Sequence, residues 1–115
     1  MKDYVEYFDE LMSGSIKLGH SIPNTMHGYN TMHEGTLKSG VLERKTKELI
    51  ALGIAISSKC DGCVTHHTHV ALKYGATEAE IQETIGVAIL MGGGPSAVYG
   101  IKTMQALEQF KKESL

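Results

Sequence analysis

The stretch "ELIALGIAISSKCDGCVTHHTHVALKYGATEAEIQE", residues 48–83, contains both cysteines of the chain and three of its six histidines. Residues 49–56 within it are apolar on every side, which is typical of a helix that runs into a core. Gly75 predicts a left-handed cap that closes the next helix. Thr77 and Glu80 then have the spacing of a capping box and predict the start of another helix. The stretch therefore predicts three consecutive helices, with Cys60 and Cys63 at the start of the second.

The rest of the chain extends this all-helical pattern. Apolar residues recur at three- and four-residue spacing, and no segment alternates apolar and polar residues as a strand does. The segments "HSIPN" at 20–24 and "GGGP" at 92–95 interrupt the periodicity. We predict a single all-α domain over residues 1–115, a bundle of about six helices at residues 3–18, 24–38, 42–57, 59–74, 78–91 and 96–112. Gly53 and Gly86, inside two of these helices, suggest that helices approach closely there.

Composition excludes several classes of protein. Apolar residues make up 42% of the chain and charged residues 21%, with a net charge of −2, which is typical of a globular protein. No basic stripe indicates a nucleic-acid partner, and no apolar run is long enough to span a membrane. The start "MKDYVEYFDE" lacks the apolar run of a signal peptide. We therefore expect a cytoplasmic location, where a cysteine pair is more often catalytic or metal-binding than a structural bridge.

The amount of apolar surface predicts self-association. A chain of 115 residues buries only about two-thirds of its surface when it folds alone. Several predicted helices are apolar on all sides, and the chain has six methionines. We therefore expect a homo-oligomer.

Helical spacing brings three reactive side chains of residues 59–74 to one face. At about 100° per residue, Cys60, Cys63 and His67 fall within about 60° of one another. His66 lies at the edge of that face and His69 on the opposite side. The spacing thus selects His67 from the three neighbouring histidines.

The position of the cysteines gives them a reason to be reactive. The unpaired N–H groups of the first helical turn and the nearby charge of Lys59 stabilise an anion, so the pKa of a thiol there falls below its ordinary value of about 8.5. The thiolate is the nucleophile in disulfide exchange and in peroxide reduction. In Cys-x-x-Cys one sulfur attacks and the other resolves the product as a disulfide, while His67 can take and return the proton.

Glu48 is a further candidate, because it heads an apolar stripe formed with Leu52, Ala55 and Ile56. A carboxylate at such a position is rarely buried without a partner. The partner is either Arg44 or Lys45 on the same helix, or a group that packing or a neighbouring subunit supplies. If this helix packs antiparallel to the next, Glu48 lies about 18 Å from the turn that carries the cysteines.

Other interpretations of these residues remain open from the pattern alone. The two thiols could be small buried side chains, or ligands of zinc together with His66, His67 or His69, although structural zinc usually draws its ligands from two separated pairs. A thioredoxin-like domain is excluded because the βαβ pattern is missing. "GGGP" lacks the Lys-Ser or Lys-Thr of a phosphate loop and is interpreted as a helix break. We expect His20, His27 and His33 to be surface or satisfied core residues, one of which could line a subunit interface near the site.

Over residues 42–91 the chain resembles the AhpD-like, carboxymuconolactone decarboxylase superfamily. The family motif is a glutamate followed by Cys-x-x-Cys-x-x-x-His, and Glu48, Cys60, Cys63 and His67 match it in identity and spacing. "ALKYGATEAEI" matches as well. The resemblance implies an all-helical fold that assembles as a trimer or hexamer. Peroxidase members have a further histidine just before the second cysteine, whereas this chain has Gly62, so the relay it implies is shorter.

The resemblance also implies a function. It implies a thiol-dependent alkyl hydroperoxidase without a bound cofactor or metal, acting on a small hydroperoxide and reduced by a dithiol or a lipoylated protein. Cys63 would be the attacking thiol, Cys60 the resolving thiol, and Glu48 with His67 the proton relay. Two alternatives stay open: a lyase of the decarboxylase branch, which does not rely on the cysteines, and a zinc-binding or redox-sensing module without turnover.

Overall fold

The computed structural model describes residues 1–114 and contains helices but no strand within that range. The helices are α1 (Tyr4–Ser21), α2 (Pro23–Leu37), α3 (Arg44–Ser57), α4 (Asp61–Lys73), α5 (Glu78–Gly92) and α6 (Gly94–Ser114). Their bounds confirm the predicted all-helical class and helix number. They differ from the expected bounds by one to three residues at most ends. No helix in the described part of the chain is long and apolar enough to cross a membrane.

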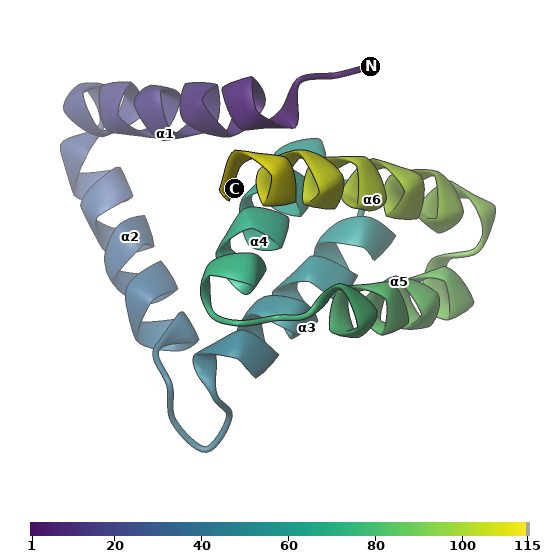
Figure 1. The fold of residues 1–115 in the computed structure, drawn as a ribbon. Coiled ribbons are helices and arrows are strands. Elements are labelled where there is room, and N and C mark those ends of the chain that lie inside the picture. Colours follow the sequence, from purple (N-terminus) through teal and green to yellow (C-terminus); the bar gives the residue numbers. More distant parts are fainter. Residues whose placement is uncertain (115) are drawn as a thin grey trace.

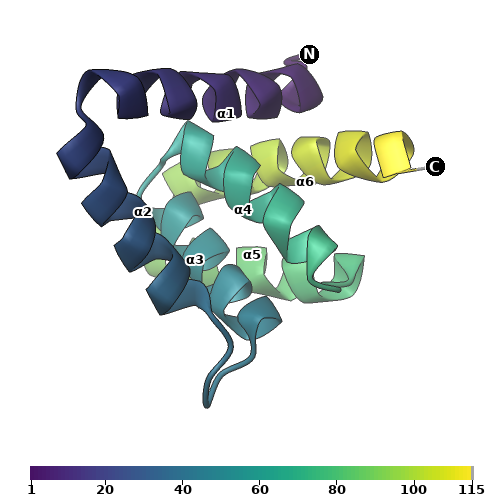
Figure 2. The ribbon, with the colours of Figure 1, turned by 90° about the vertical axis from the view of Figure 1, so that its left-hand side faces the viewer.

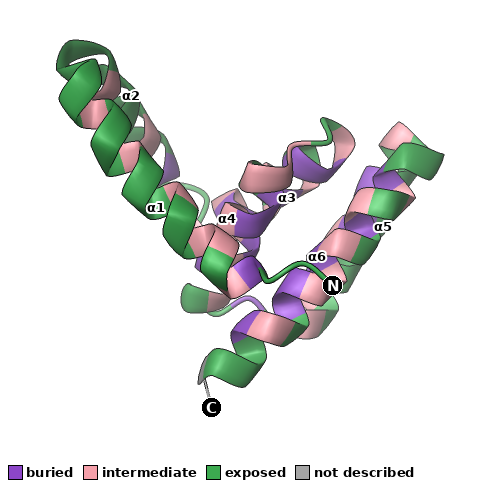
Figure 3. Cartoon of the chain, turned by 90° about the horizontal axis from the view of Figure 1, so that it is seen from above, coloured by how far each residue is buried: buried purple, intermediate pink, exposed green. Residues whose placement is uncertain are grey.

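The helices form two parts of unequal burial. Helices α3 to α6 pack against one another and enclose the main core, while α1 and α2 form a bent arm at one side (Figure 1). Most of this arm is exposed, and the buried residues concentrate on α3 to α6 (Figure 3). The start of α1 is anchored by Tyr4, which is buried beside Ala106 and Phe110 of α6. The main core consists of Leu52, Ala55, Ile56, Val64, Ala71, Ala76, Ile81, Ile85, Ala88 and Leu107.

The reversal between α3 and α4 is short and well defined. Cys60 N–H donates to Ala55 O at 3.0 Å and Lys59 N–H to Ile56 O at 3.2 Å, the pairing of a Schellman motif. Lys59 accordingly has a positive φ of 59°. Helix α4 then begins directly after Cys60, so α3 and α4 run antiparallel with the cysteines at their junction (Figure 2).

The predicted boundary signals of the later helices are confirmed. Thr77 and Glu80 form both hydrogen bonds of the capping box at the start of α5. Gly75 has a φ of 94° just after α4, and Gly93, with a φ of 74°, separates α5 from α6 within "GGGP".

The expectation for the helical glycines holds at one position and is wrong at the other. A Cβ at Gly53 would lie 3.5 Å from Thr84 Cγ2 across the α3–α5 contact, whereas one at Gly86 would meet nothing within 4 Å. A tighter contact between α5 and α6 involves a glycine that periodicity did not mark. At Gly100 of α6 a Cβ would lie only 2.6 Å from Ile85 Cγ2.

Candidate functional site

The cysteine pair lies at the N-terminus of α4. Cys60 is the N-cap residue, and its Sγ accepts the backbone N–H of Cys63 at 3.2 Å. The two sulfurs are joined in a disulfide. Cys63 is exposed and Cys60 is half-buried. Both cysteines were expected in the first turn of a helix that begins at residue 59. Helix α4 begins at Asp61, so Cys63 lies in the first turn and Cys60 caps the helix from outside it.

Glu48 has two partners, Arg44 on its own helix and His67 on α4. The sequence had left open whether the partner lies on the same helix or comes from packing with another segment. Its side chain is fully buried, yet Oε1 lies 2.7 Å from His67 Nδ1 and Oε2 accepts from Arg44 Nε, also at 2.7 Å. Burial alone would raise the pKa of Glu48, but the hydrogen bonds from His67 and Arg44 outweigh it and hold this pKa below its usual value. The carboxylate is therefore ionised at neutral pH. It accepts a proton from His67 Nδ1, an arrangement in which the neutral form of the ring has Nε2 as its acceptor.

The antiparallel packing of α3 and α4 explains how residues 19 positions apart meet. Glu48 lies near the start of α3 and is distant from the cysteines, as helix length predicts. His67 lies almost two turns into α4, on the face toward α3, so it spans the distance between the carboxylate and the cysteine pair. No second subunit is needed for the Glu48–His67 contact.

Arg44 is itself held in place by an aromatic side chain. Its guanidinium lies 4.4 Å from the ring centre of Tyr74, just past the end of α4, and Nη1 is 3.4 Å from the Tyr74 hydroxyl. Arg44, Glu48 and His67 thus form a chain of charged and polar groups that runs from the surface toward the cysteines.

A pocket of about 450 Å³ opens over the cysteine pair between α4 and the α1–α2 arm. Its wall consists of Cys60, the N-cap of α4, with Gly62, Cys63, His66 and His67 of α4, Leu11, Met12 and Ser15 of α1, and Tyr29, Asn30 and His33 of α2. Three of the four predicted site residues therefore share one pocket. Glu48 is not part of its wall and lies behind His67.

Sequence reasoning missed the contribution of α2. The ring of His33 lies 6.1 Å from that of His67 and 5.7 Å from that of His66. His33 was expected to be a surface or core residue, but it faces the site within the same chain. Tyr29, Asn30 and His33 have the spacing of one helix face, which was available as a signal. Nothing in the sequence says which face of α2 meets α4.

The other two histidines of α4 differ in surroundings. Burial, together with His67 and His33, lowers the pKa of His66 to about 4, so this ring is neutral near pH 7. His69 lies away from the pocket, with its ring 4.1 Å from that of Phe8 and 4.9 Å from that of Phe110. Its exclusion from the site, which the helical projection predicted, is confirmed.

Gly62 packs closely beneath α1. A Cβ at this position would lie 3.5 Å from Leu11 Cδ2 and 3.6 Å from the Tyr7 hydroxyl oxygen. Any longer side chain would have to enter the volume that α1 fills. Glycine at this position therefore suits the close packing of α1, which leaves no room for a histidine side chain.

Two lysines neutralise the carboxylate between the cysteines. Asp61 forms ion pairs with Lys2, from the segment before α1, and with Lys102 of α6. The hydrogen bond from Lys2 lowers the pKa of Asp61 more than burial raises it. These pairs reduce the repulsion that Asp61 would exert on a neighbouring thiolate.

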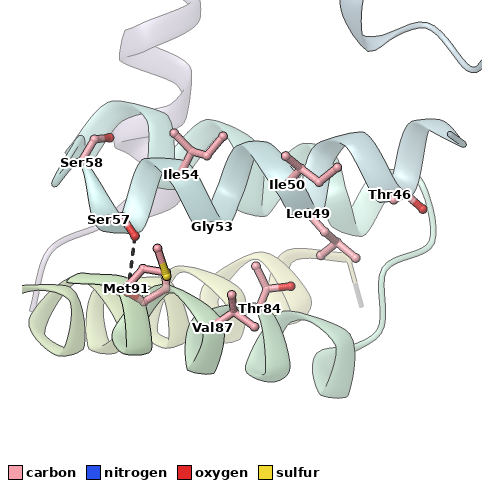
Figure 4. A pocket seen from close by; sticks show the side chains of 11 residues that line it. Thr46, Leu49, Ile50, Gly53, Ile54, Ser57, Ser58, Thr84, Val87 and Met91 are labelled. Atoms are coloured by element: carbon pink, nitrogen blue, oxygen red, sulfur yellow. Dashed lines mark hydrogen bonds between the residues drawn. The ribbon is translucent and has the colours of Figure 1, made fainter. Parts of the chain in front are cut away.

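A larger groove, of about 690 Å³, lies between α3 and α5, and its lining contains no cysteine or histidine (Figure 4). Ile50, Gly53 and Ile54 form one wall, and Thr84, Val87 and Met91 the other. No charged side chain lines it, so it offers no group for acid–base or thiol chemistry. With the cysteines joined, no group of three or more His, Cys, Asp or Glu side chains within residues 1–114 is placed to hold a metal ion.

Comparison with known proteins agrees with this architecture. An uncharacterized protein of Cupriavidus necator is 37% identical over 87 residues, which cover 76% of this chain and 77% of that protein. The crystal structure of a carboxymuconolactone decarboxylase family protein from Legionella pneumophila superposes with a TM-score of 0.89 at 34% identity, over 93% of this chain and 96% of that one.

A second structure, of a family protein from Thermotoga maritima for which a part in the antioxidative response has been suggested, superposes with a TM-score of 0.74 at 27% identity. The superposition covers 79% of this chain and 93% of the Thermotoga chain. Residues 23–106 match the carboxymuconolactone decarboxylase family. The chain belongs to this family, and it carries the family's Cys-x-x-Cys pair at Cys60 and Cys63.

Proposed function

We propose that this protein is a thiol-dependent reductase of small organic hydroperoxides, with Cys63 as the attacking thiol and Cys60 as the resolving thiol. The observation that carries the proposal is the Cys60–Cys63 disulfide in one pocket with His67, whose Nδ1 is bound to the buried carboxylate of Glu48. The suggested antioxidative part of the Thermotoga relative is consistent with it.

The chemistry follows from the orientation of His67. Because Nδ1 donates to Glu48, Nε2 is free to accept the thiol proton of Cys63. The thiolate attacks the terminal oxygen of the hydroperoxide, the S–O bond forms, and the O–O bond breaks. The alcohol leaves with one proton and Cys63 becomes a sulfenic acid. The Cys60 thiol then attacks that sulfur and releases water as the disulfide forms.

Burial and helix capping support the assignment of the two sulfurs. Cys63 is exposed to the pocket and can meet a substrate, whereas Cys60 is half-buried. A Cys60 thiolate would be stabilised by the N–H of Cys63 and the N-terminus of α4. Cys60 is therefore the better leaving group when an external thiolate attacks Cys63 to reduce the disulfide.

The reductant in this proposal is a dithiol, either a small molecule or a lipoyl group carried on a protein. Such a donor needs one thiolate to attack the exposed sulfur and a second to release the mixed disulfide. No bound cofactor or metal takes part.

The test measures consumption of an alkyl hydroperoxide with a dithiol donor by the reduced protein. Cys63→Ser should lower the rate to background, and Cys60→Ser should stop turnover after one equivalent while a sulfenic acid accumulates at Cys63, detectable with dimedone. Glu43→Gln, at an exposed carboxylate before α3, is the control. Full activity of Cys63→Ser would remove the assigned role of that residue.

We further propose that the chain forms a homo-oligomer, a trimer or hexamer, through the groove between α3 and α5. The occupant we assign to the groove is a second copy of the chain. Exposed apolar side chains project beside the hollow: Ile54 is 63% exposed, Val87 63%, Leu90 82% and Met91 76%. A groove and a ridge on one surface can fit the ridge and groove of other copies. Head-to-tail contacts that close into a ring make a trimer, and pairing about a two-fold axis joins two trimers into a hexamer. Apolar surface of this extent is typical of an interface.

Sedimentation analysis of the reduced and oxidised protein tests this assembly. Ile54→Lys should shift the mass to that of a monomer, since it places a charge in the apolar groove. Val41→Lys, at a fully exposed position of the loop before α3, should not. A monomer mass for the unaltered chain, or an assembly unaffected by Ile54→Lys, contradicts the proposal.

A further inference from the structure

The histidine of α2 lies in the pocket without a settled role. The ring of His33 is nearly parallel to that of His67, at 20°, with 6.1 Å between their centres, and edge-on to His66 at 5.7 Å. It is half-buried and lines the pocket together with both cysteines. A third imidazole thus joins the two of α4 around the place where a substrate must meet Cys63.

His33 and His67 differ in how their ring nitrogens are engaged. His67 is bound to Glu48 through Nδ1, which fixes it as a base. Within residues 1–114, the side chain of His33 makes ring contacts with His66, His67 and Tyr29 but no hydrogen bond. Its nitrogens are therefore available to a molecule in the pocket.

The helix that carries His33 is fixed to the core at one end. Lys47 Nζ of α3 donates to Thr36 O at 2.8 Å and to Lys38 O at 2.7 Å, at the C-terminus of α2. These bonds satisfy carbonyls that the helix leaves unpaired, and they hold α2 one turn from His33. The ring is thus presented from an anchored element.

We propose that His33 is a further catalytic residue, which donates its N–H to the oxygen that leaves when the hydroperoxide bond breaks. This inference rests on the proposed peroxidase function. An alkoxide is a poor leaving group, and a donor placed where its charge develops lowers the barrier. In the proposed function Nε2 of His67 is already engaged as the base for the thiol, so the leaving oxygen needs a donor from another side chain.

The step is balanced in protons and electrons. The sulfur of Cys63 supplies the electron pair of the new S–O bond, and the pair of the broken O–O bond stays on the leaving oxygen. That oxygen takes the N–H proton of His33 while the other ring nitrogen of His33 accepts a proton from solvent, so the ring stays neutral, and His67 returns to solvent the proton that it removed from the thiol. The sum is thiol plus hydroperoxide to sulfenic acid plus alcohol.

The charges around His33 suit a neutral donor. His66 and His67 face it from α4, Arg44 and Glu48 from α3, and Glu34 lies beside it on α2. Burial, and then His67, lower the pKa of His33, while Glu48 and Glu34 act against this. A neutral ring donates without placing a second positive charge beside a protonated His67.

The test compares two reactions of the pre-reduced protein. Iodoacetamide needs only an accessible thiolate, whereas cumene hydroperoxide also needs its leaving oxygen protonated. His33→Phe keeps an aromatic ring without N–H and should slow the peroxide reaction by about tenfold or more, with the alkylation rate unchanged. His33→Gln keeps a donor and should recover part of the loss, and His27→Gln, an exposed histidine of the same helix, should change neither rate.

Each outcome decides between the claims. A His33→Phe protein that reacts with hydroperoxide at the unaltered rate overturns the inference and leaves the proposed function intact. An equal loss of rate in alkylation and in peroxide reduction would mean that His33 acts on the thiolate. That result also overturns the inference. If the unaltered protein reacts with hydroperoxide no faster than a free thiol, the proposed function fails and the inference with it. Thermal melts of all three variants confirm that each is folded.

Discussion

Glu48 Oε1 lies 2.7 Å from His67 Nδ1, across the packed faces of α3 and α4. The carboxylate has no exposed surface, and Arg44 occupies its other oxygen. A buried charge is stable only when such partners satisfy it. The contact therefore orients the ring of His67. Through His67 it links the cysteine pocket to Glu48 and Arg44, which lie outside that pocket.

Glu48→Gln should weaken this connection without emptying the space. The amide keeps one acceptor but loses the charge that fixes His67. We expect alkylation of Cys63 at pH 7 to slow by about tenfold and the free energy of unfolding to fall by about 1–3 kcal/mol. Stopped-flow alkylation and urea unfolding measure the two effects. Glu43→Gln is the matched control. An unchanged alkylation rate in Glu48→Gln would show that the Glu48–His67 pair does not activate the Cys63 thiol.

Gly62→His should displace α1. The new side chain must extend beyond a Cβ that already lies 3.5 Å from Leu11 Cδ2. We expect a loss of stability of about 1–3 kcal/mol from this overpacking, measured by denaturant unfolding. Adding Leu11→Ala makes room and should recover part of the loss. If the double variant is as unstable as the sum of the singles, the clash is not with Leu11.

Gly86→Ala and Gly100→Ala form a matched pair in helix interiors. At Gly86 a Cβ meets nothing within 4 Å, so alanine should stabilise α5 by about 0.5–1 kcal/mol. At Gly100 a Cβ would lie 2.6 Å from Ile85 Cγ2, so alanine should destabilise the protein. Ile85→Leu, which has no Cγ2 methyl group, should relieve part of the effect. Thermal melting should move in opposite directions for the two alanines. If both variants shift the melting temperature in the same direction, α5 and α6 do not pack that closely at Gly100.

Acid should destabilise the fold beginning near pH 6.5. The pKa of His66 is about 4 in the folded protein, below the value of about 6.5 expected when unfolded. Between these values the unfolded chain binds the extra proton, so stability falls as the pH falls from about 6.5 to about 4. The lowered pKa of Glu48 adds a loss at still lower pH, as that carboxylate is protonated.

His66→Gln should reduce the fall in stability between pH 6.5 and 4. Melting temperatures between pH 7.5 and 4 measure it, and His20→Gln, at an exposed position of α1, serves as the control. The burial assigned to His66 is wrong if its replacement leaves the slope between pH 6.5 and 5 unchanged.

Local signals in the sequence were sufficient for much of the site. The spacing of Cys60, Cys63 and His67 predicted a shared face, and all three line one pocket because α4 is regular from Asp61 and Cys60 directly precedes it as the N-cap. The capping box at Thr77 and Glu80 depends on residues three apart, so it could be predicted without knowledge of packing. The motif containing Glu48 indicated the family, which the comparisons confirm.

Long-range contacts could not be predicted in this way. The partners of Glu48 were left open between Arg44 and another element, and both occur because one oxygen faces its own helix and the other faces α4. Gly86 was expected at a close contact, yet a Cβ there would meet nothing within 4 Å, whereas one at Gly100 would lie 2.6 Å from Ile85 Cγ2. Glycine content gives no information on which side of a helix is covered.

The sequence by itself determined the helices, their ends to within three residues and the reactive face of α4, because periodicity and caps are properties of neighbouring residues. Only the tertiary structure decided that α1 fills the space beside Gly62 and that α2 brings His33 to the cysteine pocket. The physical reason is that the arm's direction depends on packing between segments about 30 to 50 residues apart, and no local pattern encodes that packing.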